Sequence, residues 1–324
     1  MRVEGVATPG LVGRVVTEAD RFDRYRADTD GDGDLDTVDH PDFGRIELVF
    51  KNVLIEWRPF RALGFRAGLI PDAYIPAAED AWTMRFVERV AAHRNGFMPN
   101  EADTGAAVFG DLPGGYGSYE AQVSNGEGYL RAEENRHKAG QARLTLRPFP
   151  GSAGAGGLRL TGAARYVTND NPPGPDLDRR VSAVGLVSYD REGFRTDASV
   201  FGRWSYFREG GDPFVSRGAS AYVSWLSQFS VGPFARYDIV DPNASQDHAE
   251  VSLWNSRIGA DDVPADEDIN HFIWAGLLFR PTPRFDAAIW YYGRFLDEQY
   301  QGGSSGGERI DPEQQAWAGM RLSF

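Results

Sequence analysis

The sequence has no cysteine, only two lysines among its 34 basic residues, and no long apolar run. Without cysteine, the fold cannot depend on disulfide bonds or thiolate metal ligands. Nowhere do about 18 apolar residues follow one another, which excludes a transmembrane helix. The five histidines lack metal-ligand spacing, and no nucleophile–base pair or glycine–lysine phosphate loop is present. We therefore expect no enzymatic activity, and the net charge of -13 argues against nucleic-acid binding.

The last ten residues alternate between apolar and polar side chains, which predicts a strand with one dry and one wet face. The apolar positions are Ala316, Ala318, Met320 and Leu322, and the other face carries Gln315, Gly319, Arg321 and Ser323. The chain stops at Phe324. A terminal aromatic strand of this kind resembles the closing strand of a bacterial outer-membrane β-barrel, whereas the alternative is the last strand of a soluble sandwich.

Alternating segments recur along the whole chain, which predicts an all-β protein made of one domain over residues 1–324. About fourteen strands are expected, near 11–20, 43–57, 63–70, 104–111, 116–124, 137–148, 157–168, 179–190, 194–206, 216–227, 229–241, 268–280, 284–297 and 315–324. The connections are expected to alternate strictly between short turns and long polar loops, the asymmetry of outer-membrane barrels. The fold class predicted is a closed antiparallel transmembrane β-barrel.

Residues 1–7 read as the end of a further strand before the turn Thr8-Pro9-Gly10. Closed barrels of this type have an even number of strands, so about sixteen are expected when the barrel is intact. The first strand is then missing or trimmed before Met1, as is the signal peptide that an outer-membrane protein needs. In the 43–57 strand, Ile46, Leu48 and Phe50 share one face and Val53, Ile55 and Trp57 the other, which predicts a β-bulge near Lys51-Asn52.

Several short motifs between residues 43 and 110 occur in a recognisable order. They are Trp57-Arg58-Pro59, Phe65-Arg66-Ala67-Gly68-Leu69-Ile70-Pro71, Trp82-Thr83-Met84-Arg85-Phe86-Val87-Glu88-Arg89, Arg94-Asn95-Gly96-Phe97 and Asp103-Thr104-Gly105. This succession, with a turn at Arg58-Pro59, resembles the superfamily of phosphate-selective-type outer-membrane porins. The resemblance implies a sixteen-stranded, trimeric barrel that admits small hydrophilic solutes. Because the chain is poor in lysine, a lysine-lined phosphate site does not carry over.

Residues 77–94 are the one segment with a helical pattern, starting after Pro76 and ending before Gly96. This helix follows an outward strand, and in porins such a loop folds inward and narrows the lumen. Its charged residues are then candidate pore-lining groups: Glu79, Asp80, Arg85, Glu88, Arg89 and Arg94. The alternative is a helix that packs across the barrel mouth with its charges in water.

Arginines recur on the strand faces opposite the apolar ones, and these faces are expected to line the lumen. They are Arg66, Arg143, Arg147, Arg159, Arg165, Arg195, Arg203, Arg236, Arg294 and Arg321. Acids at inward positions are fewer, namely Asp197, Asp238 and Asp286. A basic lumen favours small anions. The alternative is that arginines and acids pair across the wall and leave little net field.

Residues 28–39, Asp-Thr-Asp-Gly-Asp-Gly-Asp-Leu-Asp-Thr-Val-Asp, match a twelve-residue calcium loop. Asp28, Asp30, Asp32 and Asp39 would bind Ca²⁺ by side chains, Asp34 by its carbonyl and Asp36 through water. The flanking helices of an EF-hand are absent from the pattern, so a structural ion in an extracellular loop is expected. The alternative is an acidic solvated loop without an ion.

The function predicted from these features is an outer-membrane porin of a diderm bacterium, passing small anionic or neutral solutes by passive diffusion. It would lie in the lipid bilayer as a homotrimer and bind no nucleic acid. The alternative from another class is a structural barrel that scaffolds a partner protein at the cell surface.

Overall fold

The computed structural model describes residues 2–8, 10–21, 24–27, 36–39, 46–126, 128, 138–168, 177–207, 213–227, 229–242, 244, 269–282, 285–296 and 313–322. Within them, fifteen strands form one sheet in which each strand pairs with the next along the sequence, all antiparallel. They are β1 (Arg2–Thr8), β2 (Leu11–Arg21), β5 (Ile46–Phe60), β6 (Leu63–Pro71), β7 (Ala102–Leu112), β8 (Gly117–Ser124), β9 (Ala139–Leu146), β10 (Leu158–Thr168), β11 (Leu177–Arg191), β12 (Phe194–Phe207), β13 (Phe214–Trp225), β14 (Val231–Asp241), β15 (Asn270–Thr282), β16 (Phe285–Leu296) and β17 (Glu313–Leu322). The all-β antiparallel prediction is confirmed.

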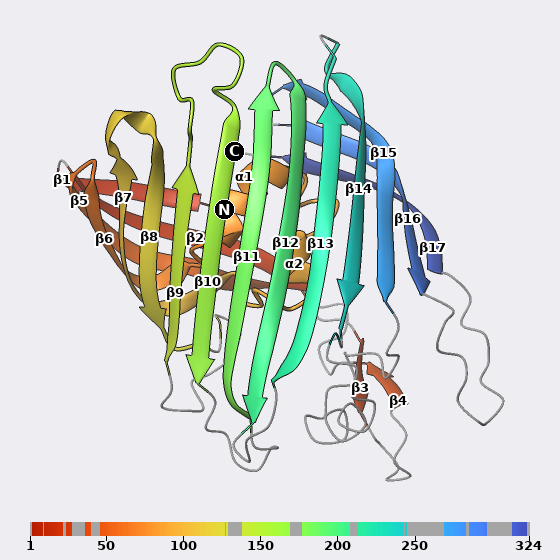
Figure 1. The fold of residues 1–324 in the computed structure, drawn as a ribbon, viewed down its shortest axis with the longest axis horizontal. Helices are drawn as coiled ribbons and strands as arrows, with labels where there is room; N and C mark the ends of the chain where they lie inside the picture. The colour runs from red at the N-terminus through yellow and green to blue at the C-terminus, as the bar shows by residue number, and fades with distance from the viewer. Residues whose placement is uncertain are drawn as a thin grey trace.

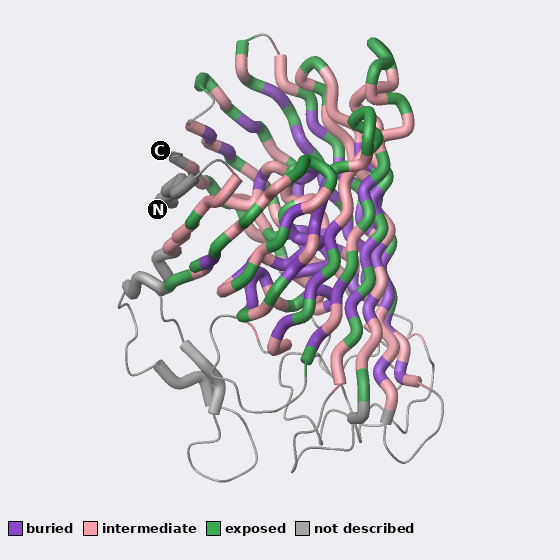
Figure 2. The backbone as a smooth tube through the Cα atoms, turned by 90° about the vertical axis from the view of Figure 1, so that its left-hand side faces the viewer, coloured by how far each residue is buried: buried purple, intermediate pink, exposed green. Residues whose placement is uncertain are grey.

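The sheet curves strongly, so that its strands stand as a bent wall (Figure 1). A separate hairpin of β3 (Arg24–Ala27) and β4 (Asp36–Asp39) lies between β2 and β5 in sequence. Two short helices, α1 (Ile75–Trp82) and α2 (Ala91–Arg94), lie on the concave side of the wall (Figure 2), and a 3₁₀ turn, η1 (Pro113–Gly115), joins β7 to β8. Among the described residues, none of the helices has the length and apolar character needed to cross a membrane.

The two edge strands of the sheet, β1 and β17, run in the same direction. β1 runs toward the turn that leads to β2, and β17 runs back toward the same rim because every neighbouring pair is antiparallel. The predicted barrel is therefore not closed by the described strands. An all-antiparallel closure needs one more strand between these two edges.

The connections follow the predicted rim asymmetry with one exception. Tight turns join β5 to β6 and β11 to β12, whereas the strand ends at the opposite rim are joined by longer connections, such as the 30 residues between β6 and β7. Strict alternation in length is wrong, however, because the connection 147–157 on the short-turn rim is longer than 208–213 on the other. The predicted turn at Arg58-Pro59 is also displaced. β5 continues to Phe60, which pairs with Leu63 across the turn.

The strand faces alternate as the sequence predicts. In β14, Phe234, Arg236 and Asp238 are buried on the concave face, whereas Val231 and Tyr237 are exposed on the convex face. Large apolar side chains cover the convex face of other strands in the same way, among them Ile55, Leu144, Val187, Val200, Val223, Leu277, Ile289 and Met320. A polar concave face and an apolar convex face are the pattern of a barrel wall that contacts lipid.

Exposed aromatic residues gather beside the short turns. Trp57 and Phe60 lie in β5 just before the β5–β6 turn, and Phe194 follows the β11–β12 turn. Trp225 ends β13, and Phe229 lies in the connection to β14. Tyr116 and Phe149 are exposed on the same rim. Aromatic side chains are enriched where the hydrocarbon core of a bilayer meets water. This row of aromatic residues therefore has the composition of an interfacial girdle.

The predicted bulge in β5 is confirmed. Val16 of β2 pairs with Asn52 and the next residue, Thr17, pairs with Phe50, so Lys51 is the extra residue. The bulge explains the change of face between Phe50 and Val53, both of which are exposed on the convex side. It also frees Lys51 from the regular alternation, and its ammonium group reaches a carboxylate inside the wall.

Candidate functional site

Residues 72–101, called the inserted segment below, connect β6 to β7 and fill part of the concave space (Figure 2). The segment is closed at its base, where the Asp72 N–H donates to the Glu101 carbonyl at 2.9 Å. The Asp72 carboxylate accepts the N–H groups of Tyr74 and Ile75 at 2.7 and 2.9 Å, which caps the start of α1. Burial raises the pKa of Asp72, and these hydrogen bonds only partly oppose the rise.

The inserted segment is fixed to the wall by apolar packing. Ile75, Ala78 and Trp82 on one face of α1 are buried against the inner face of the sheet. The Trp82 ring meets the Tyr222 ring edge-on at 4.7 Å, and Phe97 meets Phe201 at 4.6 Å. These contacts to β12 and β13 make the cluster a true core inside a polar wall.

The single helix predicted over 77–94 is wrong, because α1 ends at Trp82 and α2 begins at Ala91. Thr83 adopts a left-handed backbone with φ 54°, which stops α1. The chain between the helices lets Arg85 turn back to Glu79 and across to Glu101. Ion pairing and the packing of Trp82 thus override the helical spacing. The predicted end is confirmed, because α2 stops at Arg94 and Gly96 follows with φ 72°. The start is earlier than predicted, because α1 begins at Ile75 and Pro76 lies in its first turn.

Glu101 is the ionic centre of the inserted segment. Its side chain is 5% exposed and pairs with Lys51, with Arg85 at 2.5 Å and with His93 at 3.1 Å. Burial opposes ionisation of this carboxyl, but the hydrogen bonds of His93 and Arg85 and the charge of Lys51 outweigh burial and hold its pKa well below its usual range. The segment is therefore bonded to β5 at its last residue. Glu101 was not among the predicted site residues, because its partners are scattered in sequence.

One cavity, called the arginine cavity below, has a volume of about 1070 Å³ and lies between α1 and strands β2 and β5–β11. Its basic lining residues are Arg14, Lys51, Arg61, Arg66, Arg85, Arg143, Arg147 and Arg159. Its acidic lining residues are Asp72, Glu79, Asp80, Asp111 and Glu120. Of the predicted pore-lining groups, seven lie here: Arg66, Glu79, Asp80, Arg85, Arg143, Arg147 and Arg159.

Acidic residues pair with part of this basic lining, as expected from the alternative in which arginines and acids pair across the wall. Arg66 contacts Glu56 and Glu120 at 3.2 and 2.8 Å, and Arg143 lies 3.8 Å from Glu120. Two further arginines of the lining, Arg147 and Arg159, differ from Arg66 and Arg143. In the described part of the chain, neither Arg147 nor Arg159 forms an ion pair, and the Nε atom of Arg147 is buried without a hydrogen-bond partner.

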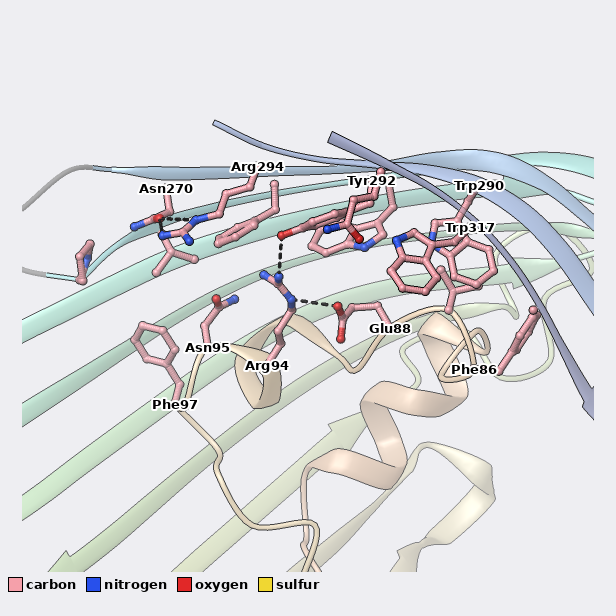
Figure 3. Close-up of a pocket in the computed structure, with 18 of the residues that line it drawn as sticks. Phe86, Glu88, Arg94, Asn95, Phe97, Asn270, Trp290, Tyr292, Arg294 and Trp317 are labelled. Atoms are coloured by element: carbon pink, nitrogen blue, oxygen red, sulfur yellow. Dashed lines mark hydrogen bonds and ion pairs between the residues drawn. The ribbon is translucent and has the colours of Figure 1, made fainter. Parts of the chain in front are cut away.

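The second cavity, the aromatic cavity, has a volume of about 1000 Å³ and lies between residues 86–97 and strands β12–β17 (Figure 3). Arg94, Glu88, Arg203 and Arg294 line it, together with several aromatic rings. Arg94 is held by Glu88 and the Tyr292 hydroxyl, each at 3.0 Å, and lies 4.1 Å over the Phe272 ring. This stacked, doubly bonded guanidinium fixes the inserted segment to β15 and β16.

The remaining predicted pore-lining residues lie outside both cavities. Arg236 is buried beneath the inserted segment, where it forks onto Asp238 and stacks on Trp82 and Trp274. Arg321 pairs with Asp286 and Arg195 with Asp190, while Arg165 donates to the Gly126 carbonyl and Arg89 is mostly exposed. Arg236 shows that an inward-facing position of the wall can be covered by the inserted segment and so lie outside both cavities.

Most of the predicted calcium loop lies outside the described residues. Asp36 and Asp39 belong to β4, and residues 28–35 are not described. In the part of the chain that the structure describes, no three acidic or histidine residues gather in a way that would hold a metal ion.

The fold has known counterparts although the sequence has none among families or curated proteins. No family model matches the chain, and no curated protein does. The structure is similar to the anion-selective porin from Comamonas acidovorans, with a TM-score of 0.63 and 11% identity, covering 100% of this chain and 88% of that one. It is similar to OmpF of Salmonella typhi, solved with daunomycin, with a TM-score of 0.61 and 13% identity, covering 99% and 88%.

A third similar structure is the trimer form of in-vitro folded OmpT, an outer membrane protein of Vibrio cholerae. Its TM-score is 0.61 at 7% identity, covering 99% of this chain and 90% of that one. At such identities the likeness concerns the fold, and the closer resemblance to phosphate-selective-type porins stays a prediction. The described chain has the fold of outer-membrane porins.

Proposed function

We propose that the protein is a passive diffusion porin of the outer membrane. The apolar convex face and the aromatic row beside the short turns support a place in the bilayer, with the short turns at the periplasmic rim. The polar concave face supports a water-filled lumen. One more strand between β1 and β17 would close an even, sixteen-stranded barrel, and three such barrels would form the homotrimer.

The arginine cavity is the proposed passage, and the inserted segment narrows it. Small hydrophilic solutes would pass between α1 and the wall strands β2 and β5–β11. We propose a modest preference for anions. The observation that carries this preference is that Arg147 and Arg159 line the cavity without a carboxylate partner in the described chain. A cationic group that is not neutralised raises the local concentration of anions in a narrow aqueous passage.

The test is reversal-potential measurement on the purified protein in planar bilayers under a salt gradient. The unmodified channel should be anion-selective, and selectivity should fall in Arg147→Gln/Arg159→Gln. The double substitution Arg85→Ala/Arg89→Ala should also lower the anion selectivity. Arg217→Gln is the matched control, because Arg217 lies on the convex face, where its side chain is 67% exposed and pairs with Asp241 at 3.2 Å. Cation selectivity of the unmodified channel contradicts the anion preference, and a folded barrel without conductance favours the scaffold function instead.

A further inference from the structure

Two arginines are neighbours on the concave face of the wall, at the rim opposite the tight turns. Arg180 lies near the start of β11 and Arg203 near the end of β12. In the strand register Arg180 is opposite Ser205, so Arg203, two residues before Ser205 and on the same face, is its diagonal neighbour. The Cα atoms of such neighbours lie about 7–8 Å apart, which lets two long side chains reach one small ligand. Arg180 and Arg203 are called the rim pair below.

The rim pair has unused hydrogen-bond donors. Among the described residues Arg180 has neither a hydrogen bond nor an ion pair, and its Nε atom is buried. Arg203 makes two long hydrogen bonds, each of 3.4 Å, to the Gly96 carbonyl and the Ser216 hydroxyl, and its Nε atom is also buried without a partner. The hydroxyl of Ser205, a fully buried residue, has no partner either. Buried donors without acceptors cost free energy, which a ligand that accepts these hydrogen bonds would recover.

No carboxylate of the described chain balances the charge of the rim pair. The charged group that acts on Arg203 is Arg180, and the one that acts on Arg180 is a third inward arginine, Arg165. Arg165 itself is attracted by Asp72 and Asp103, so its own charge is compensated. Two like charges held close together repel each other, and an anion that contacts both removes this repulsion.

Apolar groups and open space adjoin the rim pair. Arg203 lines one end of the aromatic cavity, with Asn95 and Phe97 at the same end (Figure 3). The Phe97 ring lies 5.6 Å from the Arg203 guanidinium, and Val167 of β10 is directly opposite Arg180 in the register. The methylene groups of an organic anion gain from such neighbours, whereas an inorganic ion does not.

We propose that the rim pair binds a short-chain dicarboxylate, with one carboxylate at Arg180 and the other at Arg203. Each guanidinium has the planar fork that matches the two oxygens of a carboxylate. Two carboxylates joined by a short carbon chain balance both charges and suit two arginines that start from different strands. This assignment deepens the proposed porin function, on which it rests, by naming a solute class.

The rim pair and the arginine cavity lie toward opposite rims of the wall. Arg147 and Arg159 of the cavity adjoin the connection 147–157 on the short-turn rim, whereas the rim pair is at the other ends of its strands. A dicarboxylate would therefore meet the rim pair before it reaches the narrow passage. A weak site of this kind concentrates the solute at the entrance and still releases it.

The test is calorimetric titration of the purified, detergent-solubilised protein with succinate and glutarate at neutral pH. Acetate, with one carboxylate, and sulfate and phosphate, with their charge on one compact centre, are the comparison ligands. At least one dicarboxylate should bind about tenfold more tightly than all three. Arg180→Gln and Arg203→Gln should each weaken that binding by about tenfold. The matched control Arg217→Gln, on the convex face, should leave it unchanged.

A further variant supplies the missing anion from the protein itself. Ser205→Asp places a carboxylate directly opposite Arg180 and two residues from Arg203 on the same face. This carboxylate should occupy both guanidinium groups, so dicarboxylate binding should be lost while the melting temperature rises. Because both arginines are kept, Ser205→Asp also decides the question if neither glutamine variant folds, and undiminished binding by it contradicts the proposal.

Three outcomes of the titrations overturn the assignment. They are dicarboxylates that bind no more tightly than acetate, sulfate or phosphate that binds equally well, and binding that survives both arginine substitutions. Binding in detergent does not depend on conductance, so failure of this site and failure of the porin function are observed separately.

Discussion

Lys51, the extra residue of the β5 bulge, donates a hydrogen bond to Glu101, the last residue of the inserted segment. The Glu101 carboxylate also accepts a hydrogen bond from Arg85. Glu101 therefore joins the wall to the middle of the inserted segment as well as to its end. The bulge therefore has a structural use beyond local twist, since it directs one lysine into the wall at the height of the segment's base.

Replacing Glu101 with glutamine should loosen the inserted segment. Lys51 and Arg85 would lose their shared carboxylate in a largely buried place, and the free energy of unfolding should fall by about 3 kcal/mol. Guanidinium unfolding measures the loss, and open-channel current noise should rise because the segment moves more. The matched control is Glu192→Gln, whose side chain is 78% exposed and pairs with Arg191. Equal effects of the two substitutions would contradict the central role of Glu101.

The stabilisation by Glu101 should depend on pH with a definite sign. Because its folded-state pKa is depressed, the stabilisation is complete above the ordinary glutamate pKa of about 4.3 and is lost as the pH falls toward the depressed value. The stability difference between the unmodified protein and Glu101→Gln should stay constant from about pH 5 to 8 and shrink below about pH 4. Unfolding curves across this range are the measurement, and a difference that grows on acidification would refute it.

Asp72 should affect the stability of the protein with the opposite dependence on pH. Burial raises its pKa, so its charged form costs stability above the ordinary aspartate pKa, and this cost is relieved on protonation. Asp72→Asn keeps an oxygen for the Tyr74 and Ile75 N–H groups and removes the buried charge. The melting temperature at neutral pH should therefore rise, measured by circular dichroism. Asp80→Asn, on the exposed side of the same helix, should change it little.

Val200 tests the assignment of the convex face to lipid. It lies in the middle of β12 and is 64% exposed. Val200→Arg should destabilise the barrel folded into lipid vesicles by about 2–4 kcal/mol if the position is near the bilayer midplane. Val200→Leu should be tolerated. An arginine that is accepted as readily as leucine would mean that this face meets water.

The calcium loop remains a prediction that calorimetry can test. Asp28, Asp30, Asp32 and Asp39, with the Asp34 carbonyl and a water on Asp36, should bind one Ca²⁺ with a Kd on the order of 10⁻⁴–10⁻³ M. The weak affinity follows from the shorter aspartate at the twelfth position. Asp28→Ala/Asp32→Ala should abolish the heat of binding, and an absence of heat in the unmodified protein would leave only an acidic loop.

The strands, their order and the bulge were predictable because lipid and lumen impose a period of two on every strand. The phase change between Phe50 and Val53 is visible in the sequence, and the register of Asn52 and Val16 confirms it. The inward phase of Trp290 and Tyr292 is equally visible. A pattern with this period depends only on neighbouring residues, which makes it readable without knowledge of distant contacts.

The helix boundaries and the ionic centre were not predictable in the same way. Trp82, Phe86 and Val90 have helical spacing, but Trp82 packs under Arg236 while Phe86 lines the aromatic cavity, and both contacts involve strands far along the chain. Glu101 likewise pairs with Lys51 of β5, which lies 50 residues earlier in the sequence. Which inward arginine is covered, as Arg236 is, depends on where the inserted segment lies against the wall.

In the eight-residue helix α1, the residues that pack on the wall and the residues that line the arginine cavity occupy different positions. Ile75, Ala78 and Trp82 face the wall, whereas Ala77 and Asp80 face the arginine cavity. A charge reversal at Asp80 would therefore change the charge of the arginine cavity, the proposed passage, while the contacts that hold the helix stay the same. In the proposed porin, substitutions at the cavity-facing positions of α1 would therefore change the solute preference and leave the folding contacts of the helix intact.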